Sequence, residues 1–235
     1  MNPSSNREWL AVNLPVVPYP DALALQHRLV AARITDATHP DLLLLLEHAP
    51  VYTLGRRGGA ESIIVPRSQL EDQGIAVLNT ERGGFITYHG PGQLVVYPIV
   101  DITARRIGVA QLVAALETAM IATAARWGVT AGCRPENRGV WVANRKLGSI
   151  GIAVRRGVAF HGLALNVTTD LTPFTWINPC GLENVSATSL AAEGAADVTM
   201  SAARTAMIDE LSSAFDTPIR EIDAAAFEKL LDALP

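Results

Sequence analysis

Residues 139–167 constrain the fold of this chain more than any other segment. They contain three strand-like stretches in close succession, GVWVAN (139–144), KLGSIGIAV (146–154) and VAFHGLALNV (158–167), separated only by the turns ANRK and RRG. Strands joined by turns of this length pair as antiparallel neighbours. The segment therefore predicts an antiparallel sheet at the centre of the fold.

The rest of the chain mixes strands and helices without strict alternation. The segment DLLLLLEHAPVYTLG (41–55) contains a continuous apolar run, which is typical of a strand buried on both faces. Further strands are expected at 10–15 and 75–79, and two more, joined through HGPG, within 85–100. Helices are expected at 20–33, 68–73, 109–128, 199–215 and 225–234. This pattern predicts an α+β fold, with helices packed on a largely antiparallel β-sheet.

Three of these helices carry boundary or packing signals. Asp21 is the expected N-cap of the first helix. Ser68 and Glu71 form a capping box for the second helix, and Gly74 stops it. The buried face of the long third helix is expected to consist of Val113, Leu116, Met120, Ala124 and Trp127.

Length, charge and cysteine content narrow the class of protein. The 235 residues suit one domain (1–235), in which AAEGAAD (191–197) leads into a helical tail at 198–235. The net charge of -4 argues against general nucleic-acid binding, and no apolar run is long enough to span a bilayer. The start of the chain lacks a targeting pattern. With only two cysteines the chain has no disulfide framework, so we expect a cytoplasmic protein. From the charge and the lack of a long apolar run we expect neither a nucleic-acid nor a membrane partner.

Lys146 is unusual in a chain that carries its positive charge almost entirely as arginine. The only other lysine, Lys229, lies on an expected helix near the C-terminus. In a regular strand Lys146 shares a face with Ile150, Ile152 and Val154. An amine beside an apolar surface loses hydration, which favours its neutral form and lowers its pKa. The alternative is a lysine that merely extends its ammonium into water.

Cys180, within INPCG (177–181), also has two interpretations. A free cysteine is most often an inert, buried residue. However, Pro179 cannot donate to a sheet ladder and Gly181 leaves room for a substrate to approach. The local sequence is therefore compatible with either an inert core thiol or a reactive one.

Two histidines and a glycine-rich segment are further candidates for a site. His89 lies in the turn TYHGPGQ, where binding residues often gather. His161 shares strand parity with Leu163 and Leu165, so its ring should face the core. The RGG segment (82–84) lets a backbone approach a ligand, but it matches no phosphate-binding motif. The spacing of the histidines and cysteines predicts no metal site.

Positive charge is concentrated between residues 134 and 156. One interpretation is a set of solvated turns, and the other is a basic face that steers an acidic partner toward Lys146. The cations concerned are Arg134, Arg138, Arg145, Lys146, Arg155 and Arg156.

Taken together, these segments resemble the lipoyl(octanoyl) transferases of lipoate synthesis. The order of RGG-x-x-TYHGPGQL, K-x-x-SIG and PCG is specific, and the resemblance covers residues from about 12 to 190. Glu81 stands where the family more often has aspartate. The resemblance implies the fold of the lipoate-protein ligase and biotin-protein ligase catalytic domains, with no cofactor and no metal.

The same resemblance implies the roles of individual residues. It assigns Cys180 and Lys146 to a catalytic dyad, and Gly181 and Leu182 are candidates to supply oxyanion-binding N–H groups. It assigns substrate binding to Arg82, Gly83, Gly84, Tyr88, His89, Gly90, Gly92, Gln93, Ser149, Ile150, Gly151, His161, Gly162 and Ala164. The implied reaction moves an octanoyl group from octanoyl-acyl carrier protein to Cys180. A lysine of a lipoyl domain, in the E2 subunit of a 2-oxoacid dehydrogenase or in the glycine cleavage H protein, then accepts it.

Other functions remain open at this point. A lipoate-protein ligase on the same fold would use ATP and need no nucleophilic cysteine, although the PCG segment favours a transferase. An amidotransferase would take its acyl group from another carrier domain. A non-catalytic module that binds acyl carrier protein would leave Cys180 and Lys146 as structural residues. A papain-like hydrolase is disfavoured, because Cys180 lies late in the chain with no histidine after it.

Overall fold

The computed structural model describes residues 8–135, 137–178 and 185–234. Within them, nine strands form one sheet in the order β12-β1-β2-β6-β10-β9-β8-β7, with β11 paired to β9. The strands are β1 (Trp9–Val17), β2 (Leu42–His48), β6 (Gln93–Asp101), β7 (Gly132–Cys133), β8 (Val140–Val142), β9 (Arg145–Arg155), β10 (Val158–Asn166), β11 (Ser186–Ala187) and β12 (Ile219–Ile222).

The pairing confirms the antiparallel segment predicted from residues 139–167. Strands β2, β6, β10, β9, β8 and β7 are each antiparallel to the next one in the sheet. The parallel pairs of this sheet are β1 with β2 and with β12 at one edge, and the short β11 with the start of β9. The fold is therefore α+β, as expected.

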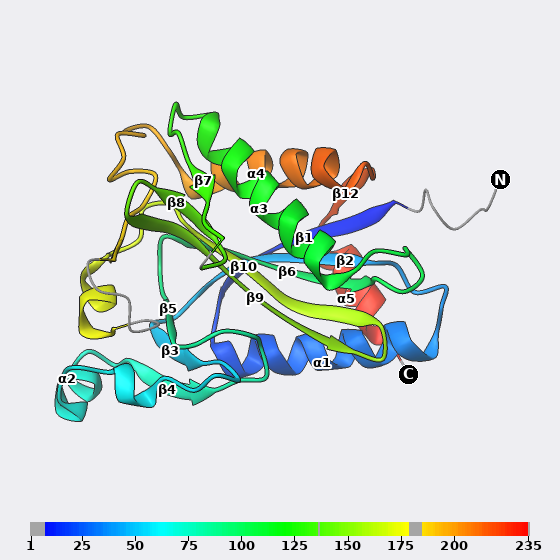
Figure 1. The fold of residues 1–235 in the computed structure, drawn as a ribbon. Helices are drawn as coiled ribbons and strands as arrows, with labels where there is room; N and C mark the ends of the chain where they lie inside the picture. Colours follow the sequence, from blue (N-terminus) through cyan, green and yellow to red (C-terminus); the bar gives the residue numbers. More distant parts are fainter. Residues whose placement is uncertain (1–7, 136, 179–184, 235) are drawn as a thin grey trace.

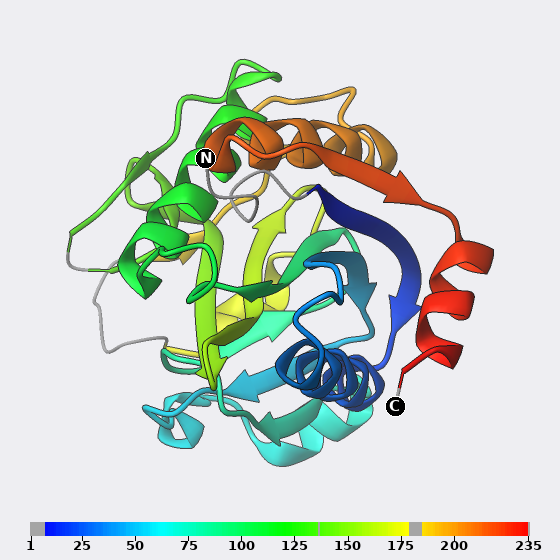
Figure 2. The same cartoon turned by 90° about the vertical axis from the view of Figure 1, so that its right-hand side faces the viewer.

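Helices cover both faces of the sheet (Figures 1 and 2). Helices α3 (Val109–Ala125) and α4 (Met200–Phe215) lie on one face, and α1 (Tyr19–Thr35) and α5 (Ala224–Asp232) lie on the other. The leucine run of β2 contributes to both cores. Leu43 and Leu45 pack with α3 and α4, whereas Leu42, Leu44 and Leu46 pack with α1. The prediction of a strand buried on both faces is confirmed.

The segment 41–55 nevertheless splits into two strands. Strand β2 ends at His48, and β3 (Val51–Leu54) belongs to a second sheet with β4 (Ala76–Asn79) and β5 (Thr87–His89). Pro50 stands at the break, where a residue without a backbone N–H cannot continue a ladder. The HGPG turn likewise joins strands of different sheets, β5 and β6. The second sheet packs with α2 (Arg67–Asp72) and with the short helices η1 (Ala60–Ser62) and η2 (Thr172–Trp176).

Two predicted helix starts are wrong. Helix α1 follows Pro18, so Asp21 lies in its first turn, and α2 follows Pro66, so Ser68 lies inside it. Neither helix has a side-chain cap, because a proline, whose side chain has no hydrogen-bond acceptor, occupies each N-cap position. The stop at Gly74 is confirmed by its positive φ of 65°.

The buried face of α3 differs in part from the prediction. Leu116, Met120 and Ala124 are buried, but Val113 and Trp127 are only partly buried. Val113 lines a cavity beside the sheet, which accounts for its exposure. None of the described helices combines the length and apolar character required to cross a bilayer.

Candidate active site

A cavity of about 600 Å³ lies beside the β9–β10 hairpin. Its walls come from the segment 82–89, from the start of α3, from β9 and β10, and from residues on both sides of the segment 179–184. Pockets of this size bind small molecules or the arms of larger ones. The cavity is therefore the candidate active site.

Lys146 lies at one end of this cavity. Its Nζ donates a hydrogen bond of 3.0 Å to Oδ1 of Asn137 and lies 5.1 Å from the centre of the Trp141 ring. A bulge precedes the rest of the strand, because Val140 pairs with Gly148 while Trp141 pairs with Lys146, which leaves Leu147 as an extra residue. The regular alternation used to place Lys146 therefore does not hold between it and Ile150, although both line the cavity.

His161 lies at the opposite end and is 1% exposed. Its φ of 56° interrupts the alternation of β10, and its ring stacks on Phe160 at 4.9 Å and meets Tyr97 edge-on. The prediction that it shares a face with Leu163 is therefore wrong. Its backbone N–H donates to Gln26, but neither ring nitrogen has a hydrogen-bond partner among the described residues.

Three buried histidines at this end are neutral at pH 7. Burial lowers the pKa of His161 to about 4, with a smaller effect from the Arg82 guanidinium. Burial also lowers the pKa of His48 to about 4, and it lowers that of His89 well below its usual value. His48 Nε2 hydrogen-bonds the hydroxyl of Tyr97 at 2.7 Å. The histidines therefore give this end of the cavity polar groups without adding positive charge.

Arg82 fixes the RGG segment against the second sheet. Its Nη2 donates to the carbonyl oxygen of Thr53 at 2.6 Å, and its Nη1 donates to the Gly83 carbonyl at 3.0 Å. The Gly83 N–H donates in turn to Ile152 of β9. A Cβ on Gly151 would lie 2.9 Å from both Arg82 Cδ and Gly83 O, so glycine is required for this close approach.

The HGPGQ segment supports the cavity from behind. His89 Nδ1 hydrogen-bonds Gln93 Oε1 at 2.7 Å, and Gln93 Nε2 donates to Asn166 Oδ1 at 2.9 Å. Asn166 Nδ2 donates to the carbonyl oxygen of Thr188, whose N–H donates to the Lys146 carbonyl. A chain of buried amides thus connects His89 with the backbone at Lys146.

Most of the predicted substrate-binding residues lie together. The cavity is lined by Arg82, Gly83, Gly84, His89, Ser149, Ile150, Gly151, His161, Gly162 and Ala164. Four others do not line it. Tyr88 packs against Tyr52 and Phe174, Gly90 is buried in the turn, Gly92 accepts hydrogen bonds from the backbone that follows β10, and Gln93 holds His89. Their roles in binding substrate stay predictions.

Cys180, together with Gly181 and Leu182, lies outside the described residues. The described chain reaches the cavity wall on both sides of that segment, at Ile177 and at Val185. Strand β11, which follows it, pairs with Arg145 and Lys146. The other cysteine, Cys133, is on β7, and partial burial and the Glu117 carboxylate raise the pKa of its thiol. Among the described residues no three His, Cys, Asp or Glu side chains are grouped to hold a metal.

Several residues of the cavity were not expected from the sequence. Tyr19, Tyr97, Asn137 and Asn166 all line it. Asn166, near the end of VAFHGLALNV (158–167), is a polar residue in an apolar strand, which is a signal that the sequence carries. Asn137 had no such signal, because only the folded loop brings it to Lys146.

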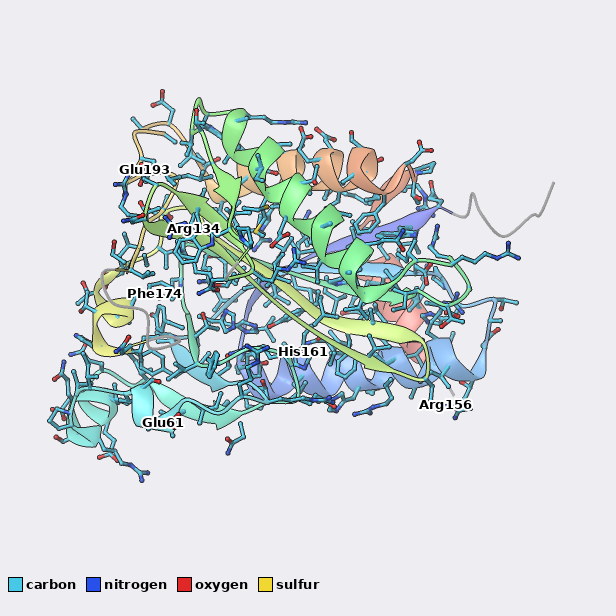
Figure 3. The ribbon with its side chains drawn as sticks, in the orientation of Figure 1. Glu61, Arg134, Arg156, His161, Phe174 and Glu193 are labelled. Atoms are coloured by element: carbon cyan, nitrogen blue, oxygen red, sulfur yellow. The ribbon has the colours of Figure 1, made fainter. Side chains whose placement is uncertain are left out.

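The predicted basic face does not exist as one surface. Arg134 lies at one end of the β9–β10 hairpin and Arg156 at the other, as Figure 3 shows. Arg145 is paired with Glu193, and Arg155 with Glu81. Arg156 follows Lys146 by ten positions along the chain, about 33 Å at the usual rise of a strand. Arg155 and Arg156 therefore do not adjoin Lys146, and the steering of an acidic partner by this stretch stays a prediction.

Glu81, the departure from the family pattern, ties three elements together. It hydrogen-bonds His27 of α1, and Arg155 of β9 donates to it at 2.9 Å. Burial opposes its ionisation, but these two hydrogen bonds outweigh that effect and lower its pKa. The carboxylate therefore anchors the start of the RGG segment.

Solved structures share this fold over nearly the whole chain. The crystal structure of lipoate-protein ligase A bound with ATP superposes with a TM-score of 0.74 at 17% identity, covering 97% of this chain and 94% of that one. The biotin protein ligase from Aquifex aeolicus in complex with biotin and ATP gives a TM-score of 0.51 at 12% identity, covering 90% and 70%. Identities this low show the fold alone, and they confirm the fold that was expected.

Sequence comparison is more specific. The profile of the Lipoyl protein ligase A/B catalytic domain matches residues 18–212. The octanoyltransferase of Desulfotalea psychrophila is 50% identical over 188 residues, 79% of this chain and 84% of that protein. The octanoyltransferase of Syntrophobacter fumaroxidans is 40% identical over 226 residues, 96% and 99% of the two chains. The chain therefore belongs to the octanoyltransferase family, acyltransferases built on the lipoyl protein ligase A/B catalytic domain.

Proposed function

We propose that this protein transfers an octanoyl group from octanoyl-acyl carrier protein to a lysine of lipoyl domains, through a thioester on Cys180. Lys146 is the proposed proton acceptor and donor. The proposed acceptors are the lipoyl domains of 2-oxoacid dehydrogenase E2 subunits and the glycine cleavage H protein. The proposed compartment is the cytoplasm, where free thiols stay reduced.

One observation carries this proposal. The cavity gathers RGG, His89, Lys146, SIG and HGLA, which are far apart in the sequence. Ile177 and Val185, which lie on either side of the segment that contains Cys180, line the same cavity. Strand β11, immediately after that segment, is held in register with Lys146. Chain connectivity therefore supports a meeting of Cys180 and Lys146 at this end.

The chemistry follows from two groups that are not reactive alone at neutral pH. A free thiol has a pKa of about 8.5 and a free amine about 10.4. When they are close, the proton passes from Cys180 to Lys146, and the thiolate attacks the octanoyl carbonyl. The C–S bond to the carrier breaks, and the departing thiolate takes the proton from the Lys146 ammonium. The octanoyl group is then a thioester on Cys180.

The second half of the reaction reverses the roles. The amine of the acceptor lysine attacks the Cys180 thioester, an amide bond forms, and the Cys180 thiolate leaves. The proton lost by the amine passes through Lys146. The incoming thioester is already activated, so the cycle consumes no ATP.

Incubation with octanoyl-acyl carrier protein in the absence of ATP tests the proposal. Intact-mass measurement should find an octanoyl adduct that hydroxylamine removes. The adduct should be absent from Cys180→Ser and present in Cys133→Ser, which is the matched control. Addition of a lipoyl domain should then discharge the adduct and modify one lysine of that domain.

Two results would contradict the proposal. An adduct retained in Cys180→Ser would exclude this cysteine as the nucleophile. Modification of the lipoyl domain only from free octanoate with ATP would make the protein a ligase, the alternative that the shared fold leaves open.

A further inference from the structure

A loop that includes residues 137–139 lies against Lys146 at one end of the cavity. Asn137 from this loop accepts the hydrogen bond from Lys146 Nζ at 3.0 Å. The loop also touches the stem of the lysine, since a Cβ on Gly139 would lie 3.0 Å from Lys146 Cε and 2.3 Å from the Gly148 carbonyl oxygen. The contact between loop and lysine is therefore close-packed.

A buried carboxylate holds this loop in place. Glu117 of α3 is 3% exposed, and its two oxygens accept hydrogen bonds from the Gly139 N–H at 2.9 Å and from Arg138 Nη1 at 3.2 Å. These two residues directly follow Asn137 in the chain. Burial of a carboxylate costs desolvation free energy, which hydrogen bonds and ion pairs must offset. Glu117 therefore fixes the residues next to Asn137 to the helix.

Trp141 completes the arrangement around the ammonium. Its Nε1 donates to the carbonyl oxygen of Asn137 at 3.1 Å, so the same residue binds both the indole and the lysine. The Lys146 ammonium lies 5.1 Å from the ring centre, within the range of a cation–π contact. The Asn137 side chain and the Trp141 ring thus set the position of Nζ from two directions.

We propose that Asn137 is a positioning residue, whose side-chain carbonyl oxygen holds the amine of Lys146 at the cavity wall for proton transfer. The inference rests on the proposed function of Lys146 and adds a residue that the family resemblance did not assign. A neutral amide suits this role. Its oxygen accepts an N–H from either the ammonium or the free amine, so it orients Nζ without the full negative charge that would keep the proton there.

Among the described residues, the other charged groups near this end are already paired or stacked on a ring. Arg138 is bonded to Glu117, and Arg145 forms a bidentate pair with Glu193. Arg134 lies 4.8 Å from the centre of the same Trp141 ring. A carboxylate placed at position 137 would therefore act mainly on Lys146 and on the thiol that shares its proton.

The test is the substitution Asn137→Asp in a Cys133→Ser background, where Cys180 is the only remaining thiol. Two rates are measured from pH 6 to 10: single-turnover acylation by octanoyl-acyl carrier protein, and alkylation of Cys180 by iodoacetamide. A negative charge beside the dyad raises the apparent pKa of both an amine and a thiol. The rising limb of each profile should therefore move up by about one pH unit. At pH 7 acylation should slow about tenfold, with little change in KM.

Matched variants separate positioning from a general charge effect. Asn144→Asp adds the same charge to the exposed β8–β9 turn, where Asn144 contacts Arg134 rather than Lys146, and should leave both profiles nearly unchanged. Asn137→Ala should lower kcat several-fold without moving the limb, and Asn137→Gln, which keeps the carbonyl oxygen, should recover part of the loss.

Three outcomes overturn the inference. Unchanged profiles in a folded Asn137→Asp protein would show that Asn137 does not act on the dyad. Equal shifts in Asn137→Asp and Asn144→Asp would reduce the effect to nonspecific electrostatics. A kcat in Asn137→Gln no higher than that in Asn137→Ala would remove the role of the carbonyl. Failure of the parent protein to form the octanoyl adduct is a separate result that contradicts the proposed function.

Discussion

The two ends of the cavity differ in how their polar groups are satisfied. At one end Lys146 is partly buried and hydrogen-bonded to a loop with charged residues at its edge. At the other end, the His161 ring is buried without a hydrogen-bond partner among the described residues, and the buried Arg82 donates four hydrogen bonds to Thr53 and Gly83. His161 pairs with Ile152, six residues along β9 from Lys146, or about 20 Å.

This difference indicates that the two ends of the cavity have different roles. At the Lys146 end a hydrogen bond from Nζ places an amine that can exchange protons, whereas at the His161 end the buried guanidinium of Arg82 holds the RGG segment in place. Changes at the Lys146 end should therefore act on kcat. Changes at the His161 end should act on folding stability and on substrate affinity.

The largest expected effect comes from Lys146→Arg. Arginine keeps the positive charge but cannot release its proton at useful pH, so it cannot serve as the base. The kcat for octanoyl transfer should fall by at least about 10³-fold, in the range for loss of a general base. Steady-state kinetics with octanoyl-acyl carrier protein measures this. Near-normal turnover in the variant would show that proton transfer does not pass through Lys146.

Arg82→Met tests the opposite end through stability. The substitution leaves the Thr53 carbonyl oxygen without its buried donor and releases the RGG segment. Loss of a buried hydrogen-bond network of this kind should lower the free energy of unfolding by about 2–4 kcal/mol. Urea unfolding measures it. Arg67→Met, on an exposed side chain of α2, is the matched control and should change it by less than about 0.5 kcal/mol.

A smaller Arg82 effect, equal to that of the control, would change the comparison. It would mean that the four hydrogen bonds are exchanged for water without cost. The His161 end would then be no more rigid than the Lys146 end.

The sequence predicted the antiparallel β8–β9–β10 segment because its turns are too short for any other pairing. The burial of Leu42 to Leu46 on both faces followed from an unbroken apolar run. The separation of β3 from β2 was not predicted, because the whole segment 41–55 was taken as one strand, although Glu47, His48 and Pro50 interrupt it between the two. Parity arguments failed at Leu147 and His161, where a bulge and a positive φ each break the alternation.

The sequence predicted the motif residues that line the cavity better than the residues that hold them in position. Ten of the residues implied by resemblance line one cavity. Asn137 and Glu117 escaped prediction, because their role depends on a loop that folds back over β9 from the far end of α3. The error about the position of Arg155 and Arg156 has the opposite cause. Residues close in sequence were taken as close in space, although an extended strand carries them far from Lys146.

The third prediction concerns pH and the buried histidines. His161 has a pKa of about 4 in the folded protein and about 6.5 when unfolded. The unfolded chain therefore binds more protons between these values, and stability is lost as the pH falls from about 6.5 to about 4. Between pH 7 and pH 5 this single group should cost about 2 kcal/mol.

His161→Leu removes that contribution. Urea unfolding at pH 7 and pH 5 should show a smaller loss in the variant than in the parent protein, by roughly this amount. His39→Leu, on the partly exposed side of the fold, is the matched control and should change the pH dependence less. If the free energy of unfolding changed equally with pH in the parent protein and in His161→Leu, then the pKa of His161 would be the same in the folded and unfolded states.

The smallest effect is expected from Arg145→Lys, one residue from the most damaging substitution. Arg145 is exposed and forms a bidentate pair with Glu193 at 2.7 Å, and exposed pairs of this kind contribute little. A lysine keeps the charge and one of the hydrogen bonds, so kcat/KM should stay within about twofold of the parent value. The same kinetic assay used for Lys146→Arg measures it. If both exchanges were equally harmful, the local charge and packing of β9 would be what matters. A large difference between two adjacent residues of like charge instead requires a function for the ionisable amine itself, because the two substitutions preserve charge equally and differ only in which residue can release a proton.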